Sequence, residues 1–295
     1  MLRLTVLALL LSFSQAPVFK SDPPHDCGAA CDEWNKPREP FKVFGNTYFV
    51  GTDGLSAMLI AGDAGLVLLD GGLEQSAALV DANIRKLGFK TEDVKLIVNS
   101  HGHFDHAGGI AALQRASGAT VAASPSGADA LQRGENTTDD PQYGFGKADN
   151  SFPPVKNVKV IKDNEVLRVG NVAITAIFTP GHTPGSTTWS WQSCEGSRCL
   201  NLVYADSISA ISAPGFKFTA EPERVNAFRR SITRLAELPC DIVISTHPQA
   251  TNLDEKVRKR AAQNGGPDPF VDQGCKALAA TAMKGLEARI AEENK

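Results

Sequence analysis

The sequence predicts an α/β fold, because in each half of the chain β-like runs are followed by a run with helical periodicity. Apolar runs at residues 42–51, 56–61 and 65–70 precede an amphipathic run at 74–87, and runs at 166–178, 187–192 and 200–204 precede one at 223–238. This repeated order suits two sheets packed face to face with helices outside. The length of 295 residues, without an internal repeat, favours one large domain over two.

Further segments complete the expected elements. Residues 94–99 are a short β-branched strand, and residues 105–116 form a capped helix with small residues near its start. Residues 241–245 are another apolar strand, and residues 275–293 have apolar side chains at the spacing of a helix that packs on the core. Residues 134–154 are rich in Asn, Asp, Gly and Pro, so they form a long loop that either covers a site or is a surface excursion.

The N-terminus has the pattern of a signal peptide at residues 1–16. Arg3 precedes an apolar run at residues 4–13, which is too short to span a membrane as a helix, and small residues follow that run. We therefore expect export to the periplasm or the medium, with the cleavage position left open. Residues 17–40 are then an N-terminal extension, and residues 41–295 are the folded domain.

Composition and cysteine usage agree with an exported globular protein. The net charge is −3, and the chain has no run of like charges, which excludes nucleic acid as an expected partner. Six cysteines form an even set, and none lies beside the histidine motifs, so they indicate disulfides in an oxidising compartment. Cys194 and Cys199 flank a four-residue turn between two strand-like runs, which suits a bridge across a hairpin. Cys27 and Cys31 remain, and their pairing is open.

Three of the six histidines, with one aspartate, lie within six residues of each other: His101, His103, Asp105 and His106. Imidazole and carboxylate together favour zinc, because calcium and magnesium prefer shells made entirely of oxygen. The motif lies between a predicted strand and a predicted helix. Ligands this close in one loop cannot all bind one ion with good geometry, so a second ion with ligands from elsewhere is expected.

Two other histidines lie in matching settings. His182 follows the strand at 173–178, and His247 follows the strand at 241–245, so both emerge at strand ends, where open α/β sheets place their sites. His25 lies outside this set, in an N-terminal stretch with prolines and cysteines. We expect His25 to be solvated.

These motifs resemble the metallo-β-lactamase superfamily, whose fold is a four-layer αββα sandwich. The likeness is greatest to the third subclass of class B, the zinc-dependent β-lactamases. Beside the histidines, its support is Gly45-Asn46-Thr47-Tyr48-Phe49-Val50-Gly51-Thr52, Asp140-Pro141-Gln142-Tyr143 and Tyr204-Ala205-Asp206-Ser207-Ile208-Ser209.

The resemblance implies two zinc ions per chain, bridged by a hydroxide that attacks the substrate. Asp105 would be catalytic as well as a ligand, because it would orient that hydroxide. The resemblance implies two ligand sets: His101, His103 and His182 for one ion, and Asp105, His106 and His247 for the other. It also implies a disulfide between Cys240 and Cys275.

Several residues around the ligands are candidates for supporting roles. By the resemblance, Ser207 and Ser209 would donate hydrogen bonds to the substrate carboxylate, although exposed strand-end serines are also often only solvated. Gln142 is a further candidate, since its amide could assist the carbonyl oxygen, or it is a polar loop residue. Asp70 resembles a residue that supports the ligands without binding metal, or it forms a turn before two glycines. Phe216 stands where some relatives have a tyrosine, so the oxyanion partner is unassigned.

The implied function is a monomeric, exported β-lactamase whose small-molecule substrates are penicillins, cephalosporins and carbapenems. The main alternative within the fold is a lactone or thioester hydrolase of the glyoxalase type, which uses an aspartate to bridge both metals. Asp206 could be that bridging aspartate. Side chains alternate along a strand, however, so only one of Asp206 and Ser207 can face the metals. The surrounding sequence favours Ser207. A non-catalytic zinc-binding protein is the other alternative. Six ligands shared by two ions argue against it, because they leave coordination positions open.

Overall fold

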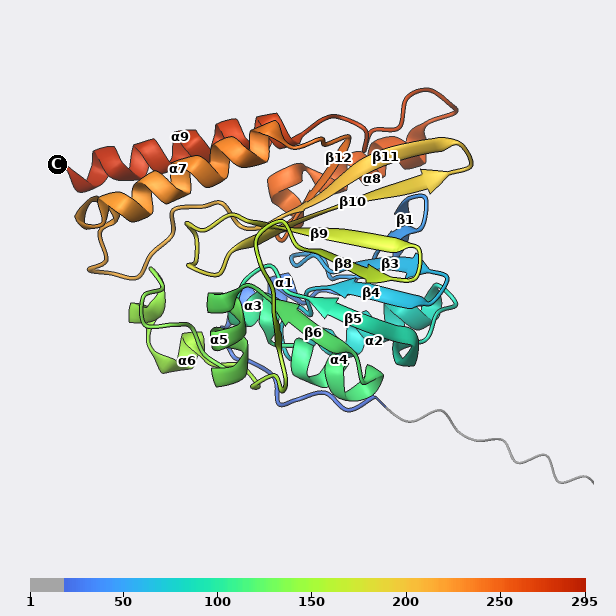
Figure 1. Ribbon diagram of the computed structural model, residues 1–295, viewed down its shortest axis with the longest axis horizontal. Helices are drawn as coiled ribbons and strands as arrows, with labels where there is room; N and C mark the ends of the chain where they lie inside the picture. The colour runs from blue at the N-terminus through green and yellow to red at the C-terminus, as the bar shows by residue number, and fades with distance from the viewer. Residues whose placement is uncertain (1–18) are drawn as a thin grey trace, which may run out of the picture.

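Two β-sheets packed face to face form the centre of the computed structural model, which describes residues 19–295 (Figure 1). The strands of the first sheet are, in spatial order, β1 (Phe41–Phe44), β2 (Thr47–Phe49), β3 (Met58–Gly62), β4 (Gly65–Leu69), β5 (Val94–Val98), β6 (Thr120–Ala123) and β7 (Lys159–Val160). Those of the second are β12 (Ile242–Ser245), β11 (Arg198–Ala205), β10 (Thr187–Glu195), β9 (Val172–Phe178) and β8 (Val166–Val169). The expected signal peptide, residues 1–16, lies outside the described residues.

Large apolar side chains fill the space between the sheets. Trp189 on β10 pairs in register with Tyr204 on β11, and both side chains are fully buried. They pack in one cluster with Phe49, Ile60 and Val98 from the first sheet. Strands of this kind are buried on both faces, because helices cover the faces that point away from this central core.

Helices cover the outer face of each sheet, which gives the αββα order expected from the sequence (Figure 1). On the first sheet these helices are α2 (Ser76–Lys86), α3 (Phe104–Ala107), α4 (Ile110–Ser117) and α5 (Pro125–Arg133). On the second they are α7 (Pro222–Glu237) and α9 (Cys275–Glu293), which lie side by side. The remaining helices are α1 (Ala29–Trp34), α6 (Lys147–Asn150) and α8 (Leu253–Ala262). The predicted fold class is confirmed.

Two predicted single strands are hairpins in the structure. The run at 42–51 reverses at Gly45, and the run at 166–178 reverses at Gly170; both glycines have positive φ, 56° and 55°. A Cβ at Gly170 would lie 1.9 Å from Asp63 Oδ1, so no side chain fits there. The prediction was wrong here because apolar side chains continue on both sides of each turn, and periodicity alone does not show a reversal.

The helix predicted at 105–116 is divided into α3 and α4 at Gly108 and Gly109. A Cβ at Gly109 would lie 2.2 Å from the carbonyl oxygen of Gly71, so a glycine is needed where the loop after β4 approaches this segment. The same close approach lets Gly71 N donate to His106 O at 2.9 Å. The break therefore fixes the position of the histidine motif against the first sheet.

Three disulfides join the six cysteines. Cys194–Cys199 bridges the β10–β11 hairpin, and Cys240–Cys275 joins the start of α9 to the loop before β12, both as expected. Cys27 and Cys31, whose pairing the sequence left open, are bonded across the start of α1. Between residues 19 and 295, no helix is both long and apolar enough to span a membrane.

Candidate metal centre

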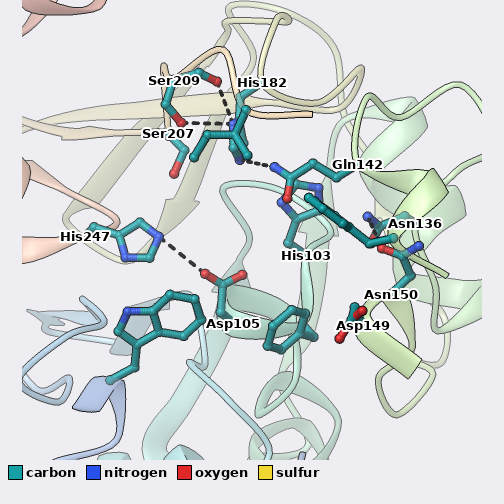
Figure 2. Close-up of a pocket in the computed structure, with 14 residues that line it drawn as sticks. His103, Asp105, Asn136, Gln142, Asp149, Asn150, His182, Ser207, Ser209 and His247 are labelled. Carbon is teal, nitrogen blue, oxygen red and sulfur yellow. Dashed lines mark hydrogen bonds and ion pairs between the residues drawn. The ribbon is translucent and has the colours of Figure 1, made fainter. Parts of the chain in front are cut away.

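A cavity of about 330 Å³ lies at the edge of the two sheets, where the histidine motif follows β5. His103, Asp105, His182 and His247 line it together with the candidate substrate residues (Figure 2). The loop at 134–154 forms one wall through Asn136, Gln142, Phe145, Asp149 and Asn150. This loop therefore covers the site and is not a surface excursion, which was the other interpretation of its sequence. Side-chain bonds hold it in place, among them Asn136 Nδ2 to Asn150 Oδ1 at 3.0 Å and Asn150 Nδ2 to the Tyr143 carbonyl at 2.7 Å.

Asp70, at the end of β4, holds the loop that carries the histidine motif. Its Oδ1 accepts hydrogen bonds from the backbone N–H of Ser100 at 2.7 Å and from Asn99 Nδ2 at 3.0 Å. Its Oδ2 accepts from Ser100 Oγ at 2.6 Å and from the Tyr204 hydroxyl at 2.9 Å. Asp70 is fully buried, with a φ of 59°. The structure thus places it as a support of the ligand loop as well as a turn residue.

His101, His103 and His182 form the first group of neighbouring donors, each offering one ligand atom within 4.8 Å of the others. Each ring is fixed through its other nitrogen. His101 Nδ1 lies 2.6 Å from Asp206 Oδ1, and His103 Nε2 lies 3.1 Å from Asp140 Oδ2. His182 Nδ1 donates to the Ser209 carbonyl at 2.9 Å. Contacts of this kind set the tautomer and orientation of a metal-binding imidazole.

Asp105, His106 and His247 form the second group. Asp105 Oδ2 lies 3.2 Å from His106 Nε2 and 3.3 Å from His247 Nε2. His247 Nδ1 donates to the Gly54 carbonyl at 3.3 Å, which leaves Nε2 as the acceptor nitrogen. His101 lies close enough to Asp105 and His106 that these three residues also make a possible metal site. The two groups are therefore adjacent.

The protonation states of His101, His182 and Asp105 suit metal binding, while the neighbouring Asp105 outweighs burial and raises the pKa of His106. Burial lowers the pKa of His101 well below its ordinary value, and burial with the neighbouring His103 lowers the pKa of His182 to about 3. Both rings are therefore neutral at pH 7 and keep a lone pair. Burial would raise the pKa of Asp105, but the contacts with His106 and His247 outweigh it and hold that pKa well below its usual range. The side chain is therefore a carboxylate.

Unpartnered buried atoms test whether a metal fits these residues. Nε2 of His101 and Nε2 of His106 are buried and have no hydrogen-bond partner among residues 19–295, although Nε2 of His106 lies 3.2 Å from Asp105 Oδ2. A buried polar atom without a partner is costly, and a metal ion would satisfy both nitrogens. The donors are imidazole nitrogens and one carboxylate, a set typical of zinc. The residues present therefore fit the expected metal.

All three predicted substrate residues line the cavity (Figure 2). Ser207 Oγ lies 2.8 Å from Thr246 Oγ1, which orients the hydroxyl. Ser209 lies beside His182: besides the carbonyl contact, its Oγ is 3.3 Å from His182 Nδ1. Gln142 Nε2 lies 3.4 Å from His182 Nε2, so its amide points at the donor group and not into solvent. Phe216 is not among the cavity-lining residues.

The choice between Asp206 and Ser207 is clear in the structure. Ser207 lines the cavity, whereas Asp206 is fully buried and contacts His101 through Nδ1, the nitrogen opposite the unpartnered Nε2. In this position Asp206 supports a ligand and is not itself in either donor group. The arrangement has the register that the sequence favoured.

Trp34 is a cavity residue that the sequence analysis missed. It comes from α1, and its ring centroid lies 5.6 Å from that of His247. It also lies 6.4 Å from Phe104, another cavity residue. The N-terminal extension thus forms a wall of the site, and the disulfide Cys27–Cys31 within it was the available sign of an ordered segment.

The expectation that His25 is solvated was wrong. Its side chain is only 7% exposed, and its ring stacks on Phe104 at a centroid distance of 4.0 Å. Its Nδ1 lies 3.7 Å from Glu74 Oε1. An aromatic face and a buried carboxylate therefore provide the contacts that solvent was expected to make, and they fix the N-terminal extension against the wall of the cavity.

Comparisons with known proteins agree with this geometry. A family model described as the metallo-beta-lactamase superfamily matches residues 50–194. The structure of the Rm3 metallo-beta-lactamase is 51% identical, with a TM-score of 0.87, and the match covers 91% of this chain and 99% of that one. MEM-A1, a subclass B3 metallo-beta-lactamase isolated from a soil metagenome library, is 46% identical, with a TM-score of 0.84 and coverage of 88% and 98%.

A more distant match is to enzymes of other activity. An N-acyl homoserine lactonase of Bacillus cereus is 32% identical over 103 residues, which are 35% of this chain and 34% of the lactonase. The match thus spans only about a third of that relative. The likeness to the two solved structures extends over nearly their whole length and is closer in identity.

Proposed function

Because this chain belongs to the metallo-β-lactamase superfamily, we propose that it is a β-lactamase which uses two zinc ions to open the amide ring of penicillins, cephalosporins and carbapenems. The observation that carries the proposal is the match to two metallo-beta-lactamase structures, one of them of subclass B3, at 46–51% identity over at least 98% of their length. Six neighbouring donors, four of which line the cavity while His101 and His106 are buried behind it, support it independently.

Two adjacent donor groups support two ions. His101, His103 and His182 would hold one zinc, and Asp105, His106 and His247 would hold the other. Zinc bound there would lower the pKa of a water molecule from about 16 to about 7 and polarise the lactam carbonyl. Asp105 would also orient the attacking water, since its carboxylate is ionised and lies at the cavity floor. The contacts of Asp105 with His106 and His247 both use Oδ2, so Oδ1 would be the oxygen that accepts a hydrogen bond from this water.

The walls of the cavity would position the substrate. The Ser207 hydroxyl faces the cavity from the side of His247, where it can donate to the carboxylate that these antibiotics carry (Figure 2). Ser209 would act mainly through His182, which it contacts twice. The Gln142 amide would donate to the carbonyl oxygen, because its nitrogen already lies beside the His182 ring.

We propose a lactone or thioester hydrolase as the second candidate. Matches to the Bacillus cereus lactonase and to a chicken acyl-coenzyme A thioesterase, 30% identical over 102 residues, favour it. Both cover only about a third of those relatives. Asp206 weakens this candidate, because the carboxylate that would bridge two metals is instead engaged with His101.

Export remains part of the proposal. Three disulfides among the described residues support an oxidising compartment, and residues 1–16 have the pattern of a signal peptide. N-terminal sequencing of the protein recovered from a periplasmic fraction tests it. A mature chain that retains residue 1 would contradict it.

The purified protein tests the activity and the metal together. It is assayed against a penicillin, a cephalosporin, a carbapenem, a lactone and a thioester, before and after chelation, with zinc or magnesium added back. We expect turnover of the three β-lactams, loss of at least about a hundredfold on chelation, and recovery with zinc alone, because the donors are nitrogen-rich. Elemental analysis should give two zinc ions per chain.

Each of the other outcomes overturns a part of the proposal. Turnover of the thioester or lactone alone would replace the β-lactamase with the second candidate. Activity that resists the chelator would exclude the metal mechanism. Zinc binding without turnover of any of the five substrates would leave a zinc-binding protein.

A further inference from the structure

A second cavity, of about 420 Å³, opens from the metal site toward α9. The two cavities share Ser207, Ser209, Ile211 and His247, so they are continuous. Figure 2 shows Ser207, Ser209 and His247 on one side of the metal site, opposite the loop residues Asn136 and Asn150. A substrate held by the donor groups would therefore reach the second cavity on the side of Ser207.

The lining of this second cavity is mostly apolar away from the serines and His247 at the metal site. Ile208, Ala210 and Ile211 come from the segment after β11, while Leu278 and Ala282 come from α9. Ile211 is 52% exposed, so its apolar side chain is accessible to a ligand in the cavity. Of the residues that line the cavity, His247 is the only one with an ionisable side chain. A charged group placed against the apolar residues of this lining would lose its hydration without gaining an oppositely charged partner.

The helix α9 presents two neighbouring faces. Cys275, Ala279 and Leu286 are buried against α7 and the second sheet. The adjacent face of α9 lines the cavity with Leu278, Ala282 and Gly285, which are spaced three or four residues apart. The small side chains of Ala282 and Gly285 keep space between α9 and the segment after β11.

Gly285 keeps the far end of the cavity open. It lies inside a helix, where glycine costs about 1 kcal/mol relative to alanine. A Cβ built there meets no heavy atom within 4 Å, so packing does not require the glycine. The space in front of Gly285 is therefore available to a ligand, and a larger side chain can occupy it without a clash.

We propose that this cavity, the α9 groove (Ile208, Ile211, Leu278, Ala282 and Gly285 among its lining), binds an apolar aryl or branched alkyl substituent of the substrate. This inference rests on the proposed hydrolase function, since the scissile amide would lie at the donor groups while the substituent extends past Ser207. Burial of apolar surface in the groove would then select substrates by that substituent.

The test introduces a larger side chain at Gly285, at the end of the α9 groove far from the metal site. The variant Gly285→Leu places an aliphatic side chain in the groove, and Ala280→Leu places the same side chain at an exposed position of α9 that does not line it. Values of kcat/KM are measured for two cephalosporins that share one acylamino side chain and differ only at the ring carbon beside the carboxylate, where one carries an aryl-bearing substituent and the other a methyl group. We expect Gly285→Leu to lower the ratio of the two values about tenfold, mainly through a higher KM for the aromatic substrate.

The controls separate the possible failures. The variant Ala280→Leu should keep the wild-type ratio, and the Tm of Gly285→Leu should not fall, because leucine favours the helix more than glycine does. An unchanged ratio in a folded, active Gly285→Leu would overturn the groove proposal while leaving the β-lactamase intact. Absence of β-lactam turnover in the wild-type protein would instead overturn the proposed function.

Discussion

At the scale of single residues, the centre depends on how each imidazole is held. The Nδ1 of His101 pairs with Asp206, the Nε2 of His103 pairs with Asp140, and the Nδ1 of His182 donates to a backbone carbonyl. In each ring the opposite nitrogen faces the donor group, and that of His182 has only the 3.4 Å contact with Gln142 Nε2. The donors are preorganised, because the tautomers are set before any ion is bound.

Asp140 offers the sharpest test of this arrangement, because it acts on two elements of the site. One oxygen contacts His103 at 3.1 Å and the other accepts the backbone N–H of Gln142 at 2.8 Å. Asp140→Asn should weaken zinc binding about 10- to 100-fold, since an amide does not fix the His103 tautomer as a carboxylate does. Competition with a chromogenic chelator measures the Kd.

The matched control for this prediction is the neighbouring Asp139. Its side chain is exposed, so Asp139→Asn removes the same charge without removing the contact to His103. We expect its zinc Kd to stay within about twofold of the wild type. Equal weakening by both variants would show that net charge, and not the orientation of the ring, controls affinity.

The sequence predicted the ligands but not these partners. His101, His103, Asp105 and His106 lie close together in the chain, and their chemistry is apparent from the spacing. Asp206 meets His101 across 105 residues and Asp140 meets His103 across 37, and neither aspartate has a local pattern that shows this contact. Such pairs arise from the packing of the two sheets, which a single sequence does not specify.

At the scale of elements, glycines explain most differences between expectation and structure. Gly45 and Gly170 turn predicted strands into hairpins, and Gly109 divides a predicted helix. In each case the apolar pattern was recognised correctly, but the chain direction changed where only glycine fits. Strand β6 and helix α5 were not predicted, because the run from 120 to 133 consists mostly of small residues with a weak period.

The end of α9 is anchored by one carboxylate. Glu293 accepts backbone N–H groups from Phe218 at 3.1 Å and Thr219 at 2.8 Å, and Arg289 donates to it at 2.7 Å. Burial would raise its pKa, but the hydrogen bonds from Thr219 and Arg289 outweigh burial and lower the pKa from 4.5 to about 2. The ionised carboxylate therefore holds the helix that forms one wall of the α9 groove.

Replacing Glu293 with glutamine should destabilise the protein in a way that depends on pH. A carboxyl group whose pKa is lower in the folded protein than in the unfolded chain stabilises the fold at any pH above its unfolded-state pKa. This stabilisation is lost as the pH falls through the folded-state pKa. We expect Glu293→Gln to lower the free energy of unfolding by about 1–2 kcal/mol at pH 7, and the difference from wild type to shrink between pH 4.5 and pH 2.

Urea unfolding of both proteins across this pH range measures the effect. The adjacent Glu292 is exposed and is the matched control, so Glu292→Gln should change the free energy of unfolding by less than about 0.5 kcal/mol. A Glu293→Gln deficit that stays constant down to pH 2 would mean that side-chain shape, and not ionisation, provides the anchor.

At the scale of the whole molecule, the two sheets meet through polar contacts as well as apolar packing. Trp189 Nε1 donates to the Asn99 carbonyl at 3.1 Å, next to the histidine motif. The Tyr204 hydroxyl contacts both Ser56 and Asp70 of the first half, each at 2.9 Å. The layers were predictable from the order of strands and helices, but these contacts were not. They explain why the donors from both halves lie in register at one edge.

The disulfide Cys240–Cys275 makes α9 part of this framework. It joins two residues 35 apart in sequence, whereas Cys194–Cys199 joins residues only 5 apart. A disulfide removes more entropy from the unfolded chain when the loop that it closes is longer. The double variant Cys240→Ser/Cys275→Ser should therefore lower the free energy of unfolding by about 3–4 kcal/mol, and Cys194→Ser/Cys199→Ser should lower it by about 2 kcal/mol. Denaturant unfolding under oxidising conditions compares the two.

The long-range bridge should also affect binding, because α9 begins at Cys275 and forms the wall of the α9 groove. We expect its loss to raise KM for the cephalosporin with the aryl-bearing substituent more than for the one with the methyl group, while the zinc content stays that of the wild type, since no donor lies on α9. Loss of zinc together with the bridge would show instead that α9 supports the donor groups themselves. A smaller loss of stability than that of the hairpin bridge would contradict the entropic explanation and place the stabilisation in the folded hairpin.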